Sequence, residues 1–311
     1  MLLTRLLPAA FLLVLGGFPL SVMDPAAAQA AETIRVQHAQ GETDVPANPK
    51  TVLVFDLAAL DTLDVLGIPV AGVPDFKLPG VLTKYASDDY AKIGSLFEPD
   101  FEAVNALRPD LIIVGGRSAP KYEALSKIAP TIDLSTDPNA FMESVARNAR
   151  TIGRVFGKED EAEALLTKLN SSMADLRKRT AGIGTGLVVL TTGNRMSVFG
   201  PASRFGILHT GFGFAPAVTG LDSAIHGEAI SFEFILEANP DWLLVVDRDA
   251  AIGRGSAAKI LDNDLVAQTK AWKQDHVIYL DPTRWYLIGG GLRALQQSAD
   301  FVAGEIAKKT D

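Results

Sequence analysis

The sequence contains no cysteine, and this absence excludes several classes of protein. Without a thiol the chain can form no disulfide scaffold, no thiolate zinc site and no cysteine nucleophile. It also lacks the residue on which surface lipoproteins are lipidated, so we expect an unlipidated protein. Enzyme motifs are missing too: there is no G-x-S-x-G, no Walker loop and no H-E-x-x-H, and the four histidines show no close helical spacing. These absences favour a protein that is not an enzyme.

Positive charge is scarce as well. Lys and Arg number 29 against 37 Asp and Glu, which gives a net charge of −8, and no run of basic residues occurs. Nucleic acids and anionic membranes both require a positive surface, so neither is expected as a partner. The length of 311 residues exceeds what one small core requires and suits two domains.

The amino-terminal segment differs in kind from the rest. Arg5 supplies a positive start, residues 6–18 form an apolar stretch too short to span a membrane, and residues 28–30 (Ala-Gln-Ala) match a cleavage site. This pattern predicts a signal peptide over residues 1–30 and an exported mature chain that begins at Ala31. For such a chain without cysteine, the expected compartment is the periplasm of a Gram-negative bacterium.

Beyond this segment, short apolar strands alternate with amphipathic helices. This alternation predicts an α/β fold with parallel sheet covered on both faces. The expected elements are a hairpin over Thr33–His38 and Thr43–Pro46, strands over Thr51–Phe55, Leu111–Val114, Leu187–Thr191, Trp242–Val246 and Val277–Leu280, and helices over Leu57–Leu66, Pro120–Ile128 and Leu292–Lys308.

One long helix is expected in the middle of the chain. From Ala140 to Thr180 no strand pattern occurs, and the only break falls at Gly157. The segment Glu159–Thr180 carries leucines and a methionine at helical spacing, and its length of roughly 33 Å is about the width of a small domain. We therefore predict a strut between two lobes. The predicted domains are the N-terminal lobe (31–157), the interlobe helix (158–180) and the C-terminal lobe (181–311).

An internal repeat supports two lobes of one design. Residues 101–119 align with residues 232–250 at an offset of 131, with seven identities in nineteen positions. Chance similarity between two helix-to-strand units is the alternative. If the repeat is real, Arg117 and Arg248 follow the carboxyl ends of equivalent strands. Ligands of open α/β sheets bind at those ends, so both arginines are expected to point into one cleft between the lobes.

Three further residues lie in loop-like segments flanked by glycine: Arg204, His226 and Tyr286. Guanidinium groups are planar, permanently charged and weakly hydrated, so the arginines suit delocalised anions. An imidazole nitrogen and a phenolate oxygen are suitable donors for ferric iron. Each also has an ordinary structural interpretation, as an arginine paired with aspartate, a packed histidine or an interfacial tyrosine.

Two glutamates occupy equivalent places in the repeat. Glu102 and Glu233 lie in the first turns of predicted helices whose N-caps are Asp100 and Ser231. Acids there complement the helix dipole without any partner. Their equivalence in two lobes also allows them to dock on basic sockets of another protein, with the nearby Glu98 as an alternative docking residue.

From about Ile34 to its end, the chain resembles the periplasmic substrate-binding proteins of iron–siderophore ABC importers, and most closely the catecholate binders of the enterobactin and petrobactin type. No single motif is decisive, but the ordered set is specific. The motifs are residues 45–50 (VPANPK), 97–102 (FEPDFE), 107–113 (LRPDLII), 198–201 (VFGP), 203–206 (SRFG), 226–227 (HG), 232–237 (FEFILE), 239–241 (NPD), 245–248 (VVDR), 261–263 (LDN) and 285–287 (WYL).

The resemblance implies a fold and a set of roles. The fold would be two Rossmann-like lobes bridged by one long helix (class III), with a ligand cleft between them and little hinge motion. The protein would carry no permanent cofactor, bind Fe(III) as a siderophore complex and act as a monomer. The implied site residues are Arg117, Arg204 and Arg248 for the catecholates, His226 and Tyr286 for iron when the siderophore supplies only four donors, and Glu102 and Glu233 for docking on the inner-membrane ABC permease.

Charge agrees with this expectation, because a ferric tris-catecholate carries about three negative charges that three arginines in a partly desolvated cleft would balance. Two alternatives stay open. One is a haem or cobalamin receptor of the same fold, with His226 or Tyr286 as an axial ligand. The other is an exported α/β enzyme whose arginines hold an anionic substrate.

Overall fold

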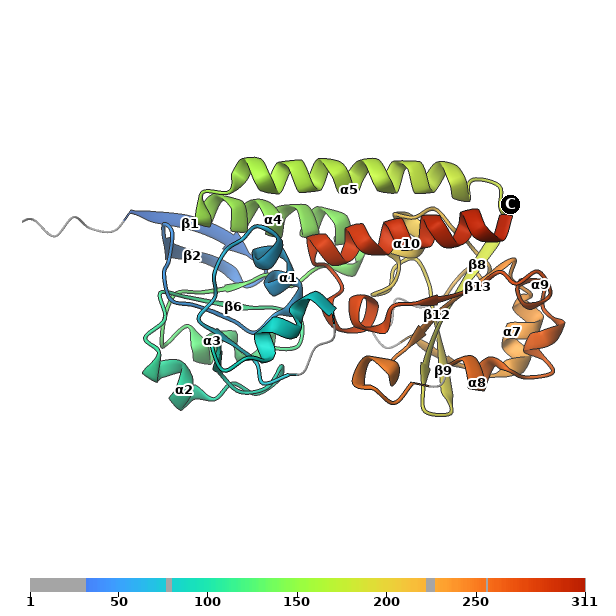
Figure 1. Ribbon diagram of the computed structural model, residues 1–311, viewed down its shortest axis with the longest axis horizontal. Coiled ribbons are helices and arrows are strands. Elements are labelled where there is room, and N and C mark those ends of the chain that lie inside the picture. The colour runs from blue at the N-terminus through green and yellow to red at the C-terminus, as the bar shows by residue number, and fades with distance from the viewer. Residues whose placement is uncertain (1–31, 77–79, 222–226, 256, 311) are drawn as a thin grey trace, which may run out of the picture. The chain divides into compact units, whose positions relative to one another are not determined.

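The strands that alternate with helices form two main sheets (Figure 1). One sheet is built from the sequence before a long helix and the other from the sequence after it. The computed structural model describes residues 32–76, 80–221, 227–255 and 257–310. The predicted signal peptide therefore lies outside the described residues, as does His226. Within the described ranges, no helix has both the length and the apolar character that crossing a membrane requires.

The first sheet is wholly parallel, with strand order β5-β4-β3-β6-β7. A separate antiparallel hairpin, β1 (Thr33–His38) with β2 (Gly41–Pro46), precedes it. The strands are β3 (Val52–Val54), β4 (Gly72–Val73), β5 (Ala91–Lys92), β6 (Leu111–Val114) and β7 (Thr131–Asp133). The helices of this part are α1 (Leu57–Val65), α2 (Phe101–Ala106), α3 (Tyr122–Leu125) and α4 (Phe141–Phe156), with short 3₁₀ turns η1 (Gly80–Ala86), η2 (Ala119–Lys121) and η3 (Pro138–Ala140).

The second sheet is mixed, with order β11-β9-β8-β12-β13 and β10 beside β8. Its strands are β8 (Thr185–Thr192), β9 (Arg195–Phe199), β10 (Ala215–Pro216), β11 (Glu228–Ile230), β12 (Trp242–Asp247) and β13 (Val277–Leu280). Its helical segments are α6 (Ile207–Thr210), α7 (Phe232–Ala238), η4 (Ala250–Ile252), α8 (Ala257–Leu261), η5 (Val266–Gln268), α9 (Lys270–Lys273), η6 (Thr283–Ile288) and α10 (Leu292–Thr310). The expectation of purely parallel sheet is wrong here, because the tight turn after β8 forces β9 to run antiparallel to it.

Both faces of each sheet are buried, as the apolar strand sequences predict. In β3, Val52 and Val54 pack on the side of α1, whereas Leu53 packs with Val104 of α2 on the other. Helices of the second sheet divide in the same way: α5, α6 and α10 cover one face, and α7, α8 and α9 cover the other. The connecting loops lie at the carboxyl ends of the strands.

Helix α5 (Glu159–Thr180) has the bounds that the sequence predicts and packs along both α4 and α10 (Figure 1). The break before it is a left-handed cap at Gly157, whose φ of 62° suits glycine. Along α5, Ala162 contributes to the core of the first sheet, and Leu169 and Met173 to that of the second. The fold class expected from the sequence, two α/β sheets linked by one long helix, is confirmed.

One predicted helix is much shorter than expected. Instead of a helix over Pro120–Ile128, a 3₁₀ turn leads into the four residues of α3. The amides of Ile128 and Ala129 both donate to the carbonyl of Leu125, which tightens and ends the last turn. Pro130 then follows, and a proline disfavours helical backbone in the residue before it.

Candidate functional site

The first predicted arginine follows a tight turn at the carboxyl end of β6. Gly115 has room for no side chain, because a Cβ there would lie 2.9 Å from the carboxyl carbon of Asp56. The Gly115 amide donates to Ser118 Oγ at 3.1 Å, which closes the turn around Arg117. β6 and β12 hold the same place in their sheets, next to the last strand. Arg117 and Arg248 therefore leave equivalent strands, as the internal repeat predicts.

Tyr286 lies on η6, a π-helix, which is a wide helical turn found frequently at functional sites. The Gly289 amide donates to the carbonyl of Arg284 at 2.8 Å, an i to i+5 bond that ends the turn. The carbonyls of Tyr286 and Leu287 lie in this last turn, where helices have acceptors without intrahelical partners. Sequence patterns did not predict this element, because six residues are too few to show a period.

The three arginines converge on Tyr286. Arg117 donates through Nη2 to the Tyr286 carbonyl at 2.7 Å and through Nη1 to the Leu287 carbonyl at 3.2 Å. Arg204 donates to the same Tyr286 carbonyl at 3.0 Å, and Arg248 donates through Nε to the Tyr286 hydroxyl at 2.9 Å. Their guanidinium carbons lie 5.6, 4.8 and 5.6 Å from the centre of the tyrosine ring, within cation–π distance. We call Arg117, Arg204 and Arg248 the arginine cluster.

The electrostatics of the arginine cluster favour an anion. Burial raises the pKa of Tyr286, but the hydrogen bond from Arg248 and the charges of Arg204 and Arg117 outweigh it, so that this pKa is lowered overall. Burial, and then the charge of Arg117, lower the pKa of Arg204. In the described ranges, the carboxylates that interact with the cluster are Asp249, 3.7 Å from Nη1 of Arg248, and the buried Asp56, whose charge acts on Arg117. Three cations thus share a place with two carboxylates, and a net positive charge remains.

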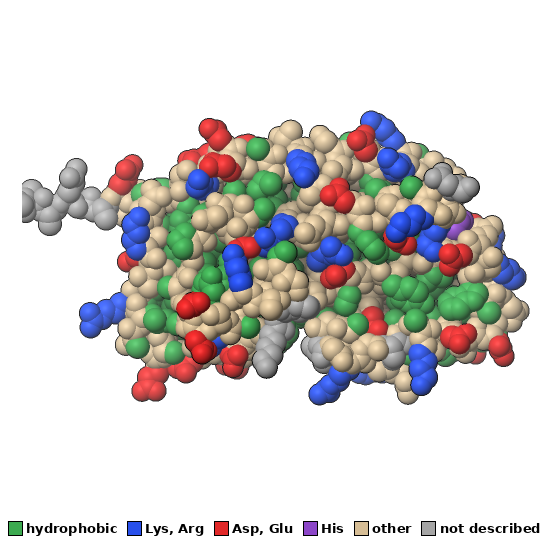
Figure 2. Space-filling view, viewed as in Figure 1, with side chains coloured by type: hydrophobic (Ala, Val, Ile, Leu, Met, Phe, Trp, Pro, Cys, Tyr) green, Lys and Arg blue, Asp and Glu red, His purple; other side chains and the backbone are tan. Residues whose placement is uncertain are grey.

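The guanidinium groups lie against Tyr286. Cavities of about 440, 470 and 460 Å³ lie elsewhere, and their lining residues include neither Tyr286 nor the arginine cluster. Figure 2 shows the surface indented at its lower edge, between the half that holds the first sheet and the half that holds the second. Each guanidinium group donates at most two of its five N–H groups to Tyr286 and Leu287, so donors remain for a ligand.

Metal-binding side chains are sparse around the cluster. No group of three or more His, Cys, Asp or Glu side chains that could hold a metal ion occurs in the described ranges. His226 cannot be placed, because it lies outside the described residues. Of the two predicted iron donors, only Tyr286 is therefore seen, with its oxygen already bonded to Arg248.

The predicted docking glutamates are both exposed in first helical turns. Asp100 caps α2 and Ser231 caps α7 by accepting backbone amides, as expected. Glu98 forms an ion pair with Lys121 at 2.6 Å. Glu102 has no ion-pair partner in the part of the chain that the structure describes. Glu98 and Glu102 therefore differ in that Glu98 is held in a surface ion pair and Glu102, within the described residues, is not.

Two exposed aromatic side chains border this corner and were not singled out from the sequence. Phe97 is 56% exposed and Phe101 is 40% exposed, while Phe232, the counterpart of Phe101 in the repeat, packs partly buried against the second sheet. Both follow a tight turn at Gly94, where a Cβ would meet backbone atoms at 2.4 Å. The two ends of the molecule are thus chemically different.

The fold and the cationic site define a two-sheet binding protein, and comparison with known proteins agrees. The family model described as "Periplasmic binding protein" matches residues 52–283. The chain is 45% identical over 280 residues to the petrobactin-binding protein YclQ of Bacillus subtilis, covering 89% of this chain and 88% of YclQ. The crystal structure of YclQ has a TM-score of 0.86 at 44% identity and covers 88% of this chain and 99% of that one.

Two more relatives point the same way. The periplasmic catecholate-siderophore binding protein VctP of Vibrio cholerae has a TM-score of 0.83 at 35% identity, covering 89% of this chain and 100% of that one. The ferric-anguibactin-binding protein FatB of Vibrio anguillarum is 32% identical over 277 residues, covering 86% of each chain. The chain belongs to the periplasmic binding protein family. Both the resemblance seen in the sequence and the prediction of a binding protein, not an enzyme, are confirmed.

Proposed function

We propose that this protein binds a ferric catecholate siderophore outside the cytoplasm and delivers it to an ABC importer. The observation that carries the proposal is the convergence of Arg117 with Arg204 and Arg248 on one point. A ferric tris-catecholate brings about three negative charges and flat aromatic rings, and guanidinium groups match both. Hydroxamate complexes are nearer to neutral and would leave these charges unbalanced. VctP, described as a catecholate-siderophore binding protein, supports the same class of ligand.

Iron is cargo in this proposal, carried mostly by oxygens of the siderophore. With a tetradentate bis-catecholate, two positions of an octahedral ferric ion stay open. We propose that His226 and Tyr286 fill them, and the lowered pKa of Tyr286 favours the phenolate that would do so. A hexadentate ligand needs neither residue. The protein itself needs no permanent cofactor.

Delivery would use the two exposed ends of the molecule. We propose Glu102 and Glu233 as docking residues for the permease, with Glu98 held back by its ion pair with Lys121. The domain limits proposed from the sequence stand beside this: a signal peptide over 1–30, lobes over 31–157 and 181–311, and an interlobe helix over 158–180. Export to the periplasm of a Gram-negative cell and a monomeric state belong to the same proposal.

A titration tests the ligand class. Ferric tris-catecholate, ferric bis-catecholate and a ferric hydroxamate are added to the wild-type protein while tryptophan fluorescence and the visible charge-transfer band are followed. Both catecholates are expected to quench at micromolar concentration and the hydroxamate to bind far more weakly. Arg248→Gln is expected to weaken both catecholates, and Arg179→Gln, the same change of charge at the exposed end of α5, is the matched control. No quenching by either catecholate would refute the proposal.

The visible band tests the coordination. His226→Ala and Tyr286→Phe are expected to shift the band of the bis-catecholate complex and to leave that of the tris-catecholate complex nearly unchanged. Identical spectra for wild type and both variants with the bis-catecholate would exclude direct ligation by these residues.

A further inference from the structure

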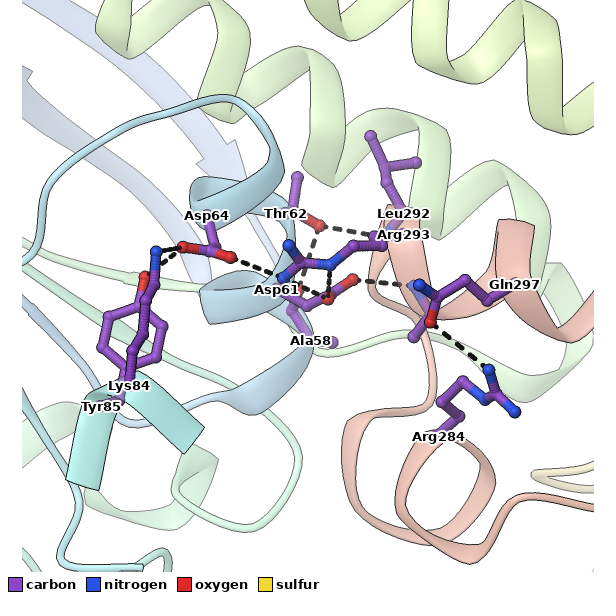
Figure 3. Close-up of polar contacts among 11 residues, drawn as sticks. Ala58, Asp61, Thr62, Asp64, Lys84, Tyr85, Arg284, Leu292, Arg293 and Gln297 are labelled. Carbon is purple, nitrogen blue, oxygen red and sulfur yellow. Dashed lines mark hydrogen bonds and ion pairs between the residues drawn. The ribbon is translucent and has the colours of Figure 1, made fainter. Parts of the chain in front are cut away.

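A buried polar network joins α1, beside the first sheet, to the beginning of α10, beside the second (Figure 3). Asp61 is 1% exposed and accepts from the Ala294 amide and from Nε of Arg293, each at 3.0 Å. One turn further along α1, Asp64 lies 2.7 Å from Nη2 of the same arginine. Thr62 accepts from the Leu292 amide at 3.3 Å. Four consecutive contacts thus fix the first turn of α10 on α1.

The network also reaches a third element. Asp64 accepts from the Tyr85 hydroxyl at 2.8 Å and pairs with Lys84, so η1 is tied to the same point (Figure 3). Burial raises the pKa of Asp61, and the Ala294 amide and the charge of Arg293 oppose that rise. For Asp64 burial also acts upward, but the bonds from Lys84, Tyr85 and Arg293 outweigh it and the pKa is lowered. The buried charges are therefore compensated within the network.

The fixed end of α10 lies next in sequence to the segment that carries Tyr286. Between η6 and Leu292 there are only three residues, Gly289 to Gly291, and a run of glycines supplies no stiffness of its own. The last of them is pressed against α1, since a Cβ on Gly291 would lie 2.5 Å from Oδ2 of Asp61. The position of η6 relative to the first sheet must therefore be set by contacts outside the glycine run.

On the other side of η6, Arg117, which follows β6, donates to the carbonyls of Tyr286 and Leu287. These bonds can form only when η6 lies close to the loop that follows β6 in the first sheet. We propose that Asp61 and Arg293 are positioning residues of the ligand site: they hold η6 in the register at which Arg117 meets the Tyr286 carbonyl and the arginine cluster is complete. This inference rests on the proposed function, because it assigns a role in the same site.

A buried ion pair often stabilises a protein no more than apolar side chains of similar volume would. It does fix the orientation of its partners, because a carboxylate that accepts from one guanidinium and one amide holds both in one register. Neither Asp61 nor Arg293 touches the arginine cluster through any bond described above. Their effect on a ligand must pass through η6.

The test compares Asp61→Asn with a matched control, Asp241→Asn. Asp241 likewise accepts a backbone amide, Thr185 at 2.9 Å, and pairs with a cation, Lys270 at 3.2 Å, but it precedes β12 at the opposite end of the sheet from the arginines. Hydrogen exchange of peptides covering residues 283–291 is measured without ligand. Affinity for a ferric tris-catecholate is measured by fluorescence, and urea unfolding gives stability.

Asp61→Asn is expected to speed exchange in 283–291 and to weaken the ferric tris-catecholate about tenfold, as is typical when a group that orients a binding residue is lost. Asp241→Asn is expected to lower stability similarly while leaving the exchange of 283–291 and the affinity within about twofold of wild type. In an Arg117→Ala background, Asp61→Asn should lose most of its effect on affinity. Thr62→Val, which removes the acceptor for the Leu292 amide together with the bond from the Thr62 hydroxyl to the Ala58 carbonyl, replaces Asp61→Asn if that variant does not fold.

Unchanged exchange in 283–291 overturns the inference, whatever the ligand does. Faster exchange with unchanged affinity, or an equal effect in the Arg117→Ala background, overturns it as well. If the wild-type protein binds no catecholate, the proposed function fails and with it the role in ligand binding, while the exchange result still decides whether the network positions η6.

Discussion

Tyr286→Phe is the most informative single change at the site, because it removes one atom from a crowded arrangement. The phenylalanine keeps the ring that faces three guanidinium groups and the carbonyl that accepts from Arg117 and Arg204. Only the hydroxyl that accepts from Nε of Arg248 at 2.9 Å is lost. Anchoring through Nε leaves both terminal nitrogens of Arg248 for a ligand. Without the anchor, this side chain is expected to swing toward Asp249, already 3.7 Å away.

The size of the effect follows from the type of bond. A hydrogen bond to a charged group contributes about 1.5–3 kcal/mol when buried. The Arg248 side chain is 42% exposed, so water competes for it and about 1 kcal/mol is the better value. Since 1.4 kcal/mol corresponds to tenfold in an equilibrium constant, affinity for a ferric tris-catecholate is expected to fall about fivefold. The visible band of that complex should not move, because no ligand of iron has changed.

A double-mutant cycle with Arg248→Gln decides whether the hydroxyl acts through this arginine. Dissociation constants are measured for wild type, both single variants and the double variant, with Tyr279→Phe as a control at a tyrosine 40% exposed on β13. Tyr286→Phe is expected to have almost no effect once Arg248 is gone. Strictly additive effects would mean that the hydroxyl meets the ligand directly, and the anchoring argument would be refuted.

Three further outcomes are expected. In a near-ultraviolet pH titration, Tyr286→Phe should remove the tyrosine that ionises at the lowest pH; because the folded pKa is lowered, the unfolded state binds more protons between the two pKa values, and stability should rise with pH across that window. Glu102→Gln should reduce import by the cognate permease without changing ligand affinity, whereas Glu98→Gln should change import little; equal losses would contradict the assignment of Glu102. Gly94→Ala, with φ of 107° and backbone at 2.4 Å, should cost more than about 2 kcal/mol by urea unfolding, and Gly182→Ala, with φ of 80° and no atom within 4 Å, only about 1 kcal/mol.

Long-period features of the fold could be predicted from the sequence, and short ones could not. Helix α5 was predicted to the residue because twenty-two positions carry its stripe and glycine marks its start. Strands β4 and β5 have two residues each, too few for any alternation to show. The π-helix η6 is also too short for a period to show in the sequence. Its wide turn is held by contacts with Arg117 and Arg204, which are distant in the chain.

The site was predictable residue by residue but not as an arrangement. A strand end followed by glycine and arginine is visible in the sequence, and so is the equivalence of Arg117 with Arg248. Their meeting on Tyr286 depends on packing between segments about 170 residues apart. Asp61 gave no signal at all, because one polar residue in a helix of this length is ordinary, and its partner Arg293 lies 232 positions away.

The internal repeat supplies two cations at equivalent places, and η6 makes them different. Arg117 donates one N–H of each terminal nitrogen to a main-chain carbonyl, which leaves one N–H on each of them and the N–H of Nε for a ligand. Arg248 is held by Nε, and among the described residues the carboxylate paired with its terminal nitrogens is Asp249, 3.7 Å from Nη1. Both arginines are therefore held on η6 with donors left for an anion. Because Arg117 also ties the first sheet to η6, a change in the position of η6 would alter how the donors of the two arginines are placed for one anion, which makes the position of η6 a determinant of affinity.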